Sequence, residues 1–227
     1  GVFYLKYNTL APLPVDFLCP FRRSEVPGAS DGLNKFDLDA WDSRFFERLG
    51  AFMQEAASQD IVVELAFFCP FYRESQGDRL WNLSPFHPDN NVNGVGSAGC
   101  EAVFVWKDEK FVHYQSAMVR KLVEFLNPFD NLMFEIMNEP YISNVATAEF
   151  QRAISKIVTD TERNLPKKHL ITQNIANGSM KIEDPDPLVS VFNFHYATPP
   201  RAVEENFSLN KPIGCNETGF AKNNLDS

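Results

Sequence analysis

The hydrophobic and polar positions of this chain follow two different periods in turn. Five short apolar runs, rich in β-branched and aromatic residues, have the length and composition of strands buried on both faces. These runs span residues 61–68, 132–137, 169–175, 189–196 and 211–215. Three longer stretches have apolar residues spaced by three and four, which is typical of amphipathic helices; they span residues 37–56, 112–126 and 147–164. Strands and helices therefore alternate, and this order predicts an α/β fold with a parallel sheet.

Polar residues mark where two of these helices begin. Asp39 is the predicted N-cap of the first helix and Thr147 that of the third, because short polar side chains accept hydrogen bonds from the free N–H groups of a first turn. Two segments follow neither period. Residues 1–36, with several Pro, Gly, Ser and Asn, are expected to form an irregular loop, and residues 73–101 a long insertion.

The strongest chemical signal is a motif that ends two of the predicted strands. In the stretch Leu132-Met-Phe-Glu-Ile-Met-Asn138-Glu139-Pro140 an apolar run leads to an Asn-Glu-Pro turn, and proline, which lacks an N–H, ends the strand. The stretch Lys211-Pro-Ile-Gly-Cys-Asn216-Glu217-Thr-Gly219 repeats this design with a glycine turn. Glutamates at the ends of two separate strands suit a two-carboxylate mechanism, in which one holds a proton and the other attacks or activates water.

These two motifs resemble those of the retaining glycoside hydrolases of clan A, in particular the cellulase-like family 5. The resemblance implies a (β/α)8 TIM barrel, with an acid/base after strand four and a nucleophile after strand seven. The five apolar runs then correspond to strands three to seven. Residues 1–227 are accordingly expected to form a single barrel catalytic domain that lacks strands one and two and part of the C-terminal end. The clan's arginine after strand two and tryptophan after strand eight have no counterpart here.

The same resemblance implies roles for five residues. Glu139 would be the general acid and then the general base, and Glu217 the nucleophile, with their carboxyl groups about 5 to 5.5 Å apart. Asn138 would bind the 2-hydroxyl of the sugar. His195 and Tyr196 fall where the clan has His-x-Tyr on strand six, although the tyrosine comes one residue early. On a regular strand the two side chains would face opposite ways, and a bulge would bring both inward.

Three further residues are candidates for substrate binding. Trp81 belongs to the insertion, which would lie over the active face of a barrel, and its flat ring could stack on a sugar. Packing within the loop is the alternative explanation for Trp81. Asn174 ends the strand predicted at 169–175, and Asn216 precedes Glu217, so both are candidates for the same pocket.

Composition narrows the possible partners. A chain of 227 residues with 44% hydrophobic residues can bury a core, and its formal net charge of −9 argues against binding nucleic acid. No apolar run is long enough to span a bilayer, so no membrane partner is expected, and the compartment stays open. Four cysteines without a C-x-x-C pair give little support to a zinc site. Cys69 and Cys215, near predicted strand ends, are expected to be buried thiols.

The sequence therefore predicts an O-glycosyl hydrolase that retains configuration and cleaves β-linked oligosaccharides or polysaccharides such as glucan or mannan, without cofactor or metal. The alternative is a carbohydrate-binding barrel that has lost hydrolysis, motivated by the displaced Tyr196 and the missing arginine and tryptophan. A metal-dependent hydrolase would need clustered His, Asp and Glu ligands, whereas the four histidines are scattered along the chain.

Overall fold

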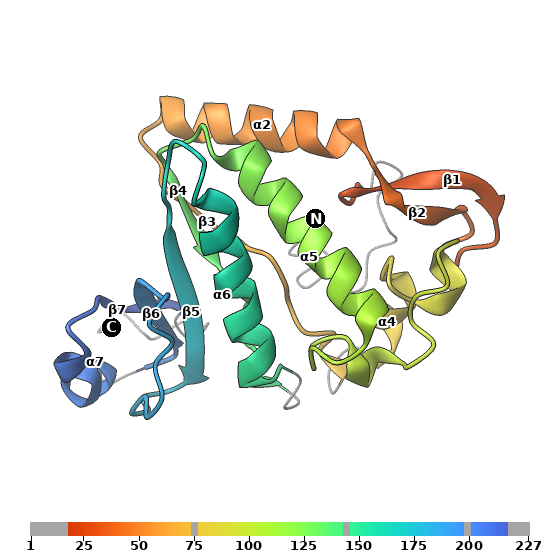
Figure 1. Ribbon diagram of the computed structural model, residues 1–227. Helices are drawn as coiled ribbons and strands as arrows, with labels where there is room; N and C mark the ends of the chain where they lie inside the picture. Colours follow the sequence, from red (N-terminus) through yellow and green to blue (C-terminus); the bar gives the residue numbers. More distant parts are fainter. Residues whose placement is uncertain (1–17, 74–76, 143–145, 198–200, 218–227) are drawn as a thin grey trace, which may run out of the picture.

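The computed structural model describes residues 18–73, 77–142, 146–197 and 201–217 (Figure 1). These residues form a two-stranded antiparallel sheet and a five-stranded parallel sheet. In Figure 1 the antiparallel pair and the parallel sheet lie at opposite ends of the molecule, with the long helices between and above them.

The strands of the parallel sheet lie side by side in the same order as in the sequence. They are β3 (Val63–Ala66), β4 (Leu132–Glu135), β5 (Leu170–Asn177), β6 (Val191–His195) and β7 (Ile213–Glu217). Each neighbouring pair is parallel, which confirms the predicted parallel α/β sheet. The sheet curls into half of a barrel, and a closed eight-stranded barrel is not formed by the described part of the chain.

Three long helices cover the outer face of this sheet. They are α2 (Ser43–Ser58), α5 (Glu109–Leu126) and α6 (Ala148–Glu162). Aromatic rings join them to each other and to the end of β3: Phe46 and Phe125 have ring centroids 5.1 Å apart, and Phe68 and Phe150 5.2 Å. Thr147 caps α6 as predicted, because its hydroxyl accepts a hydrogen bond from the N–H of Phe150 at 3.1 Å.

The segment before α2 corrects two predictions. Residues expected to be an irregular loop form a hairpin of β1 (Phe21–Pro27) and β2 (Asn34–Trp41), so α2 begins six residues later than residue 37. Asp42 is the N-cap instead of Asp39, and its carboxylate accepts from the N–H of Arg44 at 3.0 Å. The physical reason is an alternating pattern: Phe36 and Leu38 face inward between polar residues, which is the period of a strand rather than a helix.

Shorter helical turns occupy the connections. They are α4 (Arg79–Leu83), η1 (Pro88–Asn90), η2 (Cys100–Ala102), α7 (Arg201–Asn206) and η4 (Phe207–Leu209). The first three belong to the predicted insertion, and Gly96 fixes its path, because a Cβ there would lie 2.2 Å from the carbonyl oxygen of Phe86. Among the described residues, no helix is long and apolar enough to span a membrane.

The two faces of the parallel sheet differ in polarity. Residues paired across parallel strands share a face, so the register places mostly apolar side chains on one face and most of the polar ones on the other, together with Met133 and Val191. The outer face carries Leu65, Phe134, Ile171 and Phe192. The inner face carries Glu64, Glu135, Thr172, Asn174, Asn193 and His195. Barrel interiors are usually filled by branched apolar residues, so a largely polar inner face is unusual.

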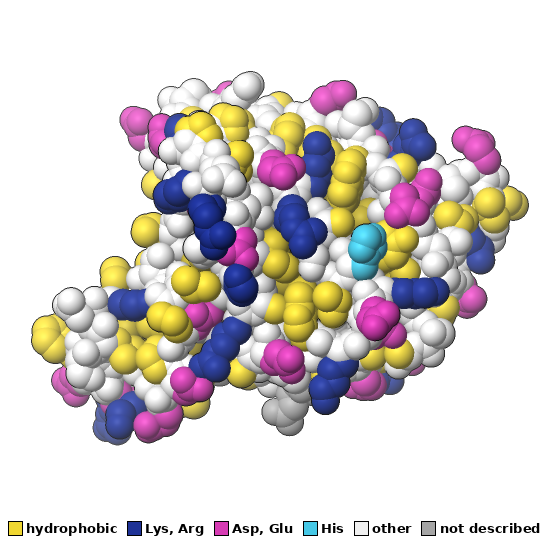
Figure 2. Space-filling view, viewed as in Figure 1, with side chains coloured by type: hydrophobic (Ala, Val, Ile, Leu, Met, Phe, Trp, Pro, Cys, Tyr) yellow, Lys and Arg dark blue, Asp and Glu magenta, His cyan; other side chains and the backbone are white. Residues whose placement is uncertain are grey.

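The surface over the helices is mixed in charge. Figure 2 shows Lys and Arg side chains interspersed with Asp and Glu on the face presented by α5 and α6, with small hydrophobic areas between them. All four cysteines are free thiols. Cys69 is half-buried and Cys215 is exposed, which corrects the expectation that both are buried. Cys215 is exposed because β7 is the last strand of the described sheet and has a neighbour on one side only.

Candidate active site

The two Asn-Glu motifs meet at the carboxyl edge of the parallel sheet. Beyond β4 the backbone keeps contact with both neighbouring strands, since the N–H of Ile136 donates to Thr172 and that of Asn138 to Phe68. Glu139 follows directly, and Pro140 begins the turn. Because parallel strands end at the same edge, β7 brings Glu217 to the same side.

A histidine lies between the two carboxyl groups. His195 Nδ1 is 3.2 Å from Glu139 Oε1 and 3.5 Å from Glu217 Oε2. One ligand atom from each of the three residues lies within 4.8 Å of the other two. The side chains of His195 and Glu139 are 2% and 6% exposed, whereas that of Glu217 is 17% exposed. The two glutamates, far apart in the sequence, thus face a common space, and Glu217 is the more accessible of them.

Tyr72 holds the carboxyl group of Glu139 from the other side. Its hydroxyl donates to Glu139 Oε2 at 2.6 Å and accepts from the side-chain amide of Asn138 at 2.8 Å. Burial, with the nearby Cys69 and Glu139, raises the pKa of Tyr72 far above its usual range. The phenol therefore stays protonated and acts as a hydrogen-bond donor to Glu139. Sequence reasoning did not select Tyr72. Its position just after the lip of the strand predicted at 61–68 is the signal that could have found it.

Tyr196 makes the corresponding contact with Glu217. Its hydroxyl donates to Glu217 Oε1, and its backbone N–H donates to the carbonyl oxygen of Glu217 at 2.7 Å. The β6–β7 ladder has a register shift between Phe194 and His195, and Tyr196 adopts a φ of 52°. This local irregularity turns the side chain of Tyr196 to the same side as that of His195. A regular strand would have pointed the two side chains to opposite faces of the sheet.

Strained backbone coincides with this cluster. Tyr72, Glu139 and Tyr196 have φ values of 50°, 45° and 52°, and they make up half of the six non-glycine residues with positive φ in the described ranges. Each such conformation costs on the order of 1–3 kcal/mol and persists where surrounding contacts enforce it, often at functional sites. Glu139 supplies one of the two carboxyl groups, and Tyr72 and Tyr196 direct their hydroxyls to them.

Tyr141 is a further neighbour that the sequence did not indicate. It follows Pro140, and its hydroxyl donates to the Asn177 side-chain oxygen at 2.7 Å. Burial, followed by the charges of Glu139 and Glu217, raises the pKa of Tyr141 above its usual range. Tyr141 therefore presents a neutral hydroxyl beside the acidic cluster.

Three predicted substrate-binding residues have other surroundings. Trp81 is 7% exposed and packs against Phe71 and His87 in the hydrophobic core, so its burial argues against a stacking platform. Asn216 uses its side-chain amide to bond Glu64 at 3.0 Å. Asn174 is fully buried on β5 beside Asn193, and neither polar atom of its side chain has a hydrogen-bond partner.

The histidine and the two glutamates also have the chemistry of metal ligands. Imidazole nitrogen and carboxylate oxygen both bind divalent transition metals, and the fold gathers three such groups that are scattered in the sequence. Scattering along the chain therefore does not argue against a metal at this position. The tyrosine hydroxyls compete with that use, because they already donate to both carboxyl groups.

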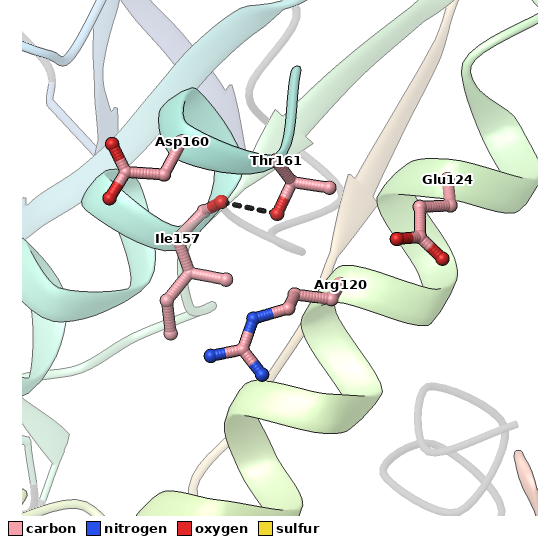
Figure 3. Close-up of a pocket in the computed structure, with 5 residues that line it drawn as sticks. All are labelled: Arg120, Glu124, Ile157, Asp160 and Thr161. Atoms are coloured by element: carbon pink, nitrogen blue, oxygen red, sulfur yellow. Dashed lines mark hydrogen bonds between the residues drawn. The ribbon is translucent and has the colours of Figure 1, made fainter. Parts of the chain in front are cut away.

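A pocket of about 240 Å³ on the helical layer is separate from this site. Figure 3 shows its lining of Arg120, Glu124, Ile157, Asp160 and Thr161, which come from α5 and α6. The hydroxyl of Thr161 is turned back onto the carbonyl oxygen of Ile157 at 2.6 Å. None of the residues of the carboxylate cluster lines this pocket, which is therefore not a candidate active site.

Comparison with known proteins gives a likeness in structure. No protein-family model matches the chain, and no curated protein matches it. A crystal structure from Bacteroides vulgatus ATCC 8482, described as that of a “putative glycoside hydrolase”, superimposes with a TM-score of 0.61 at 16% sequence identity. The superposition covers 89% of this chain and 34% of that protein, so the chain spans about a third of its neighbour's length. At this identity the likeness shows the fold alone, a glycoside hydrolase-like fold.

Proposed function

We propose that this chain carries the catalytic glutamates of a retaining glycoside hydrolase that cleaves β-linked glycans. The observation that carries the proposal is the meeting of Glu139 and Glu217 across His195, with one oxygen of each carboxyl group within 4.8 Å. Carboxyl groups about 5 to 5.5 Å apart suit double displacement, whereas the inverting reaction needs about 6.5 to 9.5 Å to admit a water. The glycoside hydrolase-like fold supports the same reaction class.

The reaction proceeds in two steps. Glu217 attacks the anomeric carbon and forms a covalent glycosyl ester, while Glu139 gives its proton to the departing glycosidic oxygen. Glu139, now a carboxylate, takes a proton from a water that attacks the anomeric carbon and releases Glu217. Two inversions leave the configuration unchanged. The greater exposure of Glu217 favours it as the group that meets the sugar.

The neighbouring side chains support these roles. Tyr196 donates to one oxygen of Glu217 and so leaves the other, which faces His195, to attack. Tyr72 orients the carboxyl group of Glu139 and, by accepting from Asn138, also fixes that amide. Asn138 is assigned to the 2-hydroxyl of the sugar, a contact that strengthens in the transition state. Asn174 is assigned to the same pocket from its place on β5, where it pairs with Asn193 on the inner face of the sheet.

The β-linked substrate and the catalytic barrel domain are proposed from the resemblance of the Asn138-Glu139-Pro140 and Glu217 motifs to cellulase-like enzymes. Recombinant protein that contains this chain is incubated with β-glucans, β-mannans and aryl β-glycosides. We expect Glu139→Gln and Glu217→Ala each to reduce kcat by at least about 10³-fold, because each removes a group that bonds to reacting atoms. Glu47→Gln, on the exposed side of α2, is the matched control and should retain full activity.

Azide distinguishes the two glutamates. In Glu217→Ala, azide should occupy the vacated space and give the glycosyl azide of inverted configuration, whereas in Glu139→Ala it should attack the glycosyl intermediate and give the retained product. Full activity in either variant would reject the assignment. Sugar binding without turnover by the wild-type protein would favour the non-hydrolytic barrel.

The gathering of His195 with both glutamates favours one second candidate, a metal-dependent hydrolase. Its test is simple. If activity were lost on dialysis against EDTA and restored by Zn²⁺ or Mn²⁺, the metal-dependent reaction would replace the double displacement. Under the leading proposal, EDTA leaves kcat unchanged, and an added divalent metal that binds the cluster lowers it.

A further inference from the structure

One carboxyl group on the inner face of the sheet joins strands that are not neighbours. Glu64 lies on β3, yet its Oε1 accepts from the Thr172 hydroxyl of β5 at 2.5 Å and from the Asn193 amide of β6 at 2.6 Å. Its Oε2 accepts from the Asn216 amide of β7 at 3.0 Å. In the order of the sheet β7 is the strand farthest from β3, so Glu64 bridges the concave side of the half-barrel.

This network requires a carboxylate and not merely a polar residue. All three partners present N–H or O–H donors, and an ionised glutamate is a group that accepts at both ends. Hydrogen bonds to a charged acceptor are about twice as strong as neutral ones. A glutamine at this position would direct an NH2 group at one of the three donors.

The backbone of β7 is shaped for this contact. A Cβ on Gly214 would lie 2.7 Å from the side-chain oxygen of Asn193, closer than non-bonded atoms approach. The glycine thus lets the Asn193 amide lie against β7 while its nitrogen donates to Glu64. Glu64 and Gly214 therefore both determine where the Asn193 side chain lies, Glu64 by accepting from its nitrogen and Gly214 by leaving room for its oxygen.

The network ends beside the proposed nucleophile. Asn216, which donates to Glu64, immediately precedes Glu217, and β7 has a paired strand on one side only in the described sheet. On β6 the register shifts just before Glu217, and the Tyr196 N–H holds the Glu217 carbonyl from that side, so the Asn216 bond to Glu64 is a second hold on this end of β7, from the concave side of the sheet. A displacement of about 1 Å between reacting groups can cost on the order of 10² in rate.

We propose that Glu64 is a positioning residue that, through Asn193 and Asn216, holds the end of β7 so that Glu217 stays opposite Glu139. This inference rests on the proposed function. Glu64 itself lies one layer below the reacting atoms and touches no substrate in this scheme. Its effect is on where the nucleophile stands, and therefore on kcat rather than on KM.

The kinetic test uses 2,4-dinitrophenyl β-cellobioside, whose good leaving group departs without an acid. The concentration of active sites is measured with 2,4-dinitrophenyl 2-deoxy-2-fluoro-β-cellobioside, which traps the glycosyl-enzyme. We expect Glu64→Ala to lower kcat per active site about 10- to 100-fold at nearly unchanged KM, and Glu64→Gln to lower it less. Gly214→Ala should reproduce the loss without altering Glu64.

Two matched variants separate positioning from stability. Thr172→Val and Asn216→Ala each remove one hydrogen bond to Glu64, but only Asn216 adjoins Glu217. Asn216→Ala should lower kcat, whereas Thr172→Val should leave it near the wild-type value. The double variant Glu64→Ala/Asn216→Ala should be no slower than the slower single variant, since both act through one contact. Losses that multiply would mean that Asn216 acts on the substrate by itself, which would overturn the proposal.

Hydrogen exchange gives a readout that needs no substrate. The peptide spanning residues 211–217 should exchange faster in Glu64→Ala and Asn216→Ala than in the wild type, while the peptide of α5 stays protected. If the wild-type protein turns over the substrate and β7 exchange or kcat per active site is unchanged in Glu64→Ala, Glu64 is not a positioning residue. A wild-type protein with no turnover of any β-glycoside would instead reject the proposed function, and with it the catalytic meaning of Glu64.

Discussion

Each carboxyl group of the candidate site accepts a hydrogen bond from a tyrosine. Tyr72 donates to Glu139 and Tyr196 to Glu217, and His195 lies between the two glutamates. A carboxyl group held on both sides has few orientations left, and such preorganisation lets a group act without rearrangement when the reaction begins. At the scale of single residues, the site is therefore defined as much by its tyrosines as by its glutamates.

The Tyr72 hydroxyl should matter most where Glu139 acts as an acid. Tyr72→Phe removes the donor to Glu139 Oε2 and the acceptor of the Asn138 amide. Hydrogen bonds to charged groups contribute about 1.5–3 kcal/mol, so we expect kcat/KM to fall roughly 10- to 100-fold. The loss should be largest for glycosides with poor leaving groups and small for dinitrophenyl glycosides, which need no acid. Steady-state kinetics over a series of aryl β-glycosides would measure it.

The control for this prediction is Tyr114→Phe, which removes a phenol from α5 away from the cluster and should leave the kinetics unchanged. An equal loss for good and poor leaving groups would show that Tyr72 does not act through Glu139.

At the scale of elements, the strands and helices begin and end where short polar residues and proline permit. Thr147 caps α6, and Pro140 ends the segment that follows β4. Helix α2 is capped by Asp42, whose carboxylate accepts from the backbone N–H of Arg44 and pairs with its guanidinium. The side-chain hydrogen bond from Arg44 lowers the pKa of Asp42 below its usual 3.8.

Asp42→Ala should destabilise the protein by about 1 kcal/mol at pH 7, the usual effect of losing an N-cap. Because the pKa of Asp42 is lowered by folding, its contribution is present above pH 3.8 and is lost as the pH falls through the lowered value. Urea unfolding at several pH values should therefore show the difference between wild type and variant narrowing below pH 3.8. Asp42→Asn, which keeps a capping oxygen, should lose less, and a difference independent of pH would contradict the role of the charge.

At the scale of the whole molecule, burial follows the layers of the fold. Helices cover the outer face of the parallel sheet, the hairpin of β1 and β2 packs at the other end, and β7 is open on one side (Figure 1). The four cysteines differ in exposure: Cys19 is buried, Cys69 and Cys100 are half-buried, and Cys215 is exposed. Burial raises the pKa of the Cys19 thiol to about 12.

Thiol modification should follow this order. With iodoacetamide at pH 8, Cys215 should react first and Cys19 last, because only about one Cys19 in 10⁴ would be a thiolate at that pH and the reagent could not reach it. Peptide mass spectrometry at timed intervals measures the four rates. In urea the four thiols should react at similar rates. If Cys19 reacted as fast as Cys215 in the native protein, the buried position of the segment before β1 would be wrong.

The sequence alone determined the alternation of strands and helices and the two Asn-Glu strand ends. Apolar runs such as 132–137 fix the strands because burial on both faces requires them, and parallel pairing then brings the ends of β4 and β7 to one edge. Local chemistry also sufficed for Thr147, whose cap is formed within one turn. These features depend on neighbours in the chain, and a sequence pattern contains that information.

Tertiary structure alone decided which side chains surround the carboxyl groups. Tyr72 and Tyr196 reach them through positive φ angles and a register shift, and Glu64 reaches β7 across the curl of the sheet. Packing of the insertion likewise buried Trp81 against Phe71 and His87. The physical reason is common to these cases: contacts between distant segments override the local preference of the backbone, and no spacing along the chain records them.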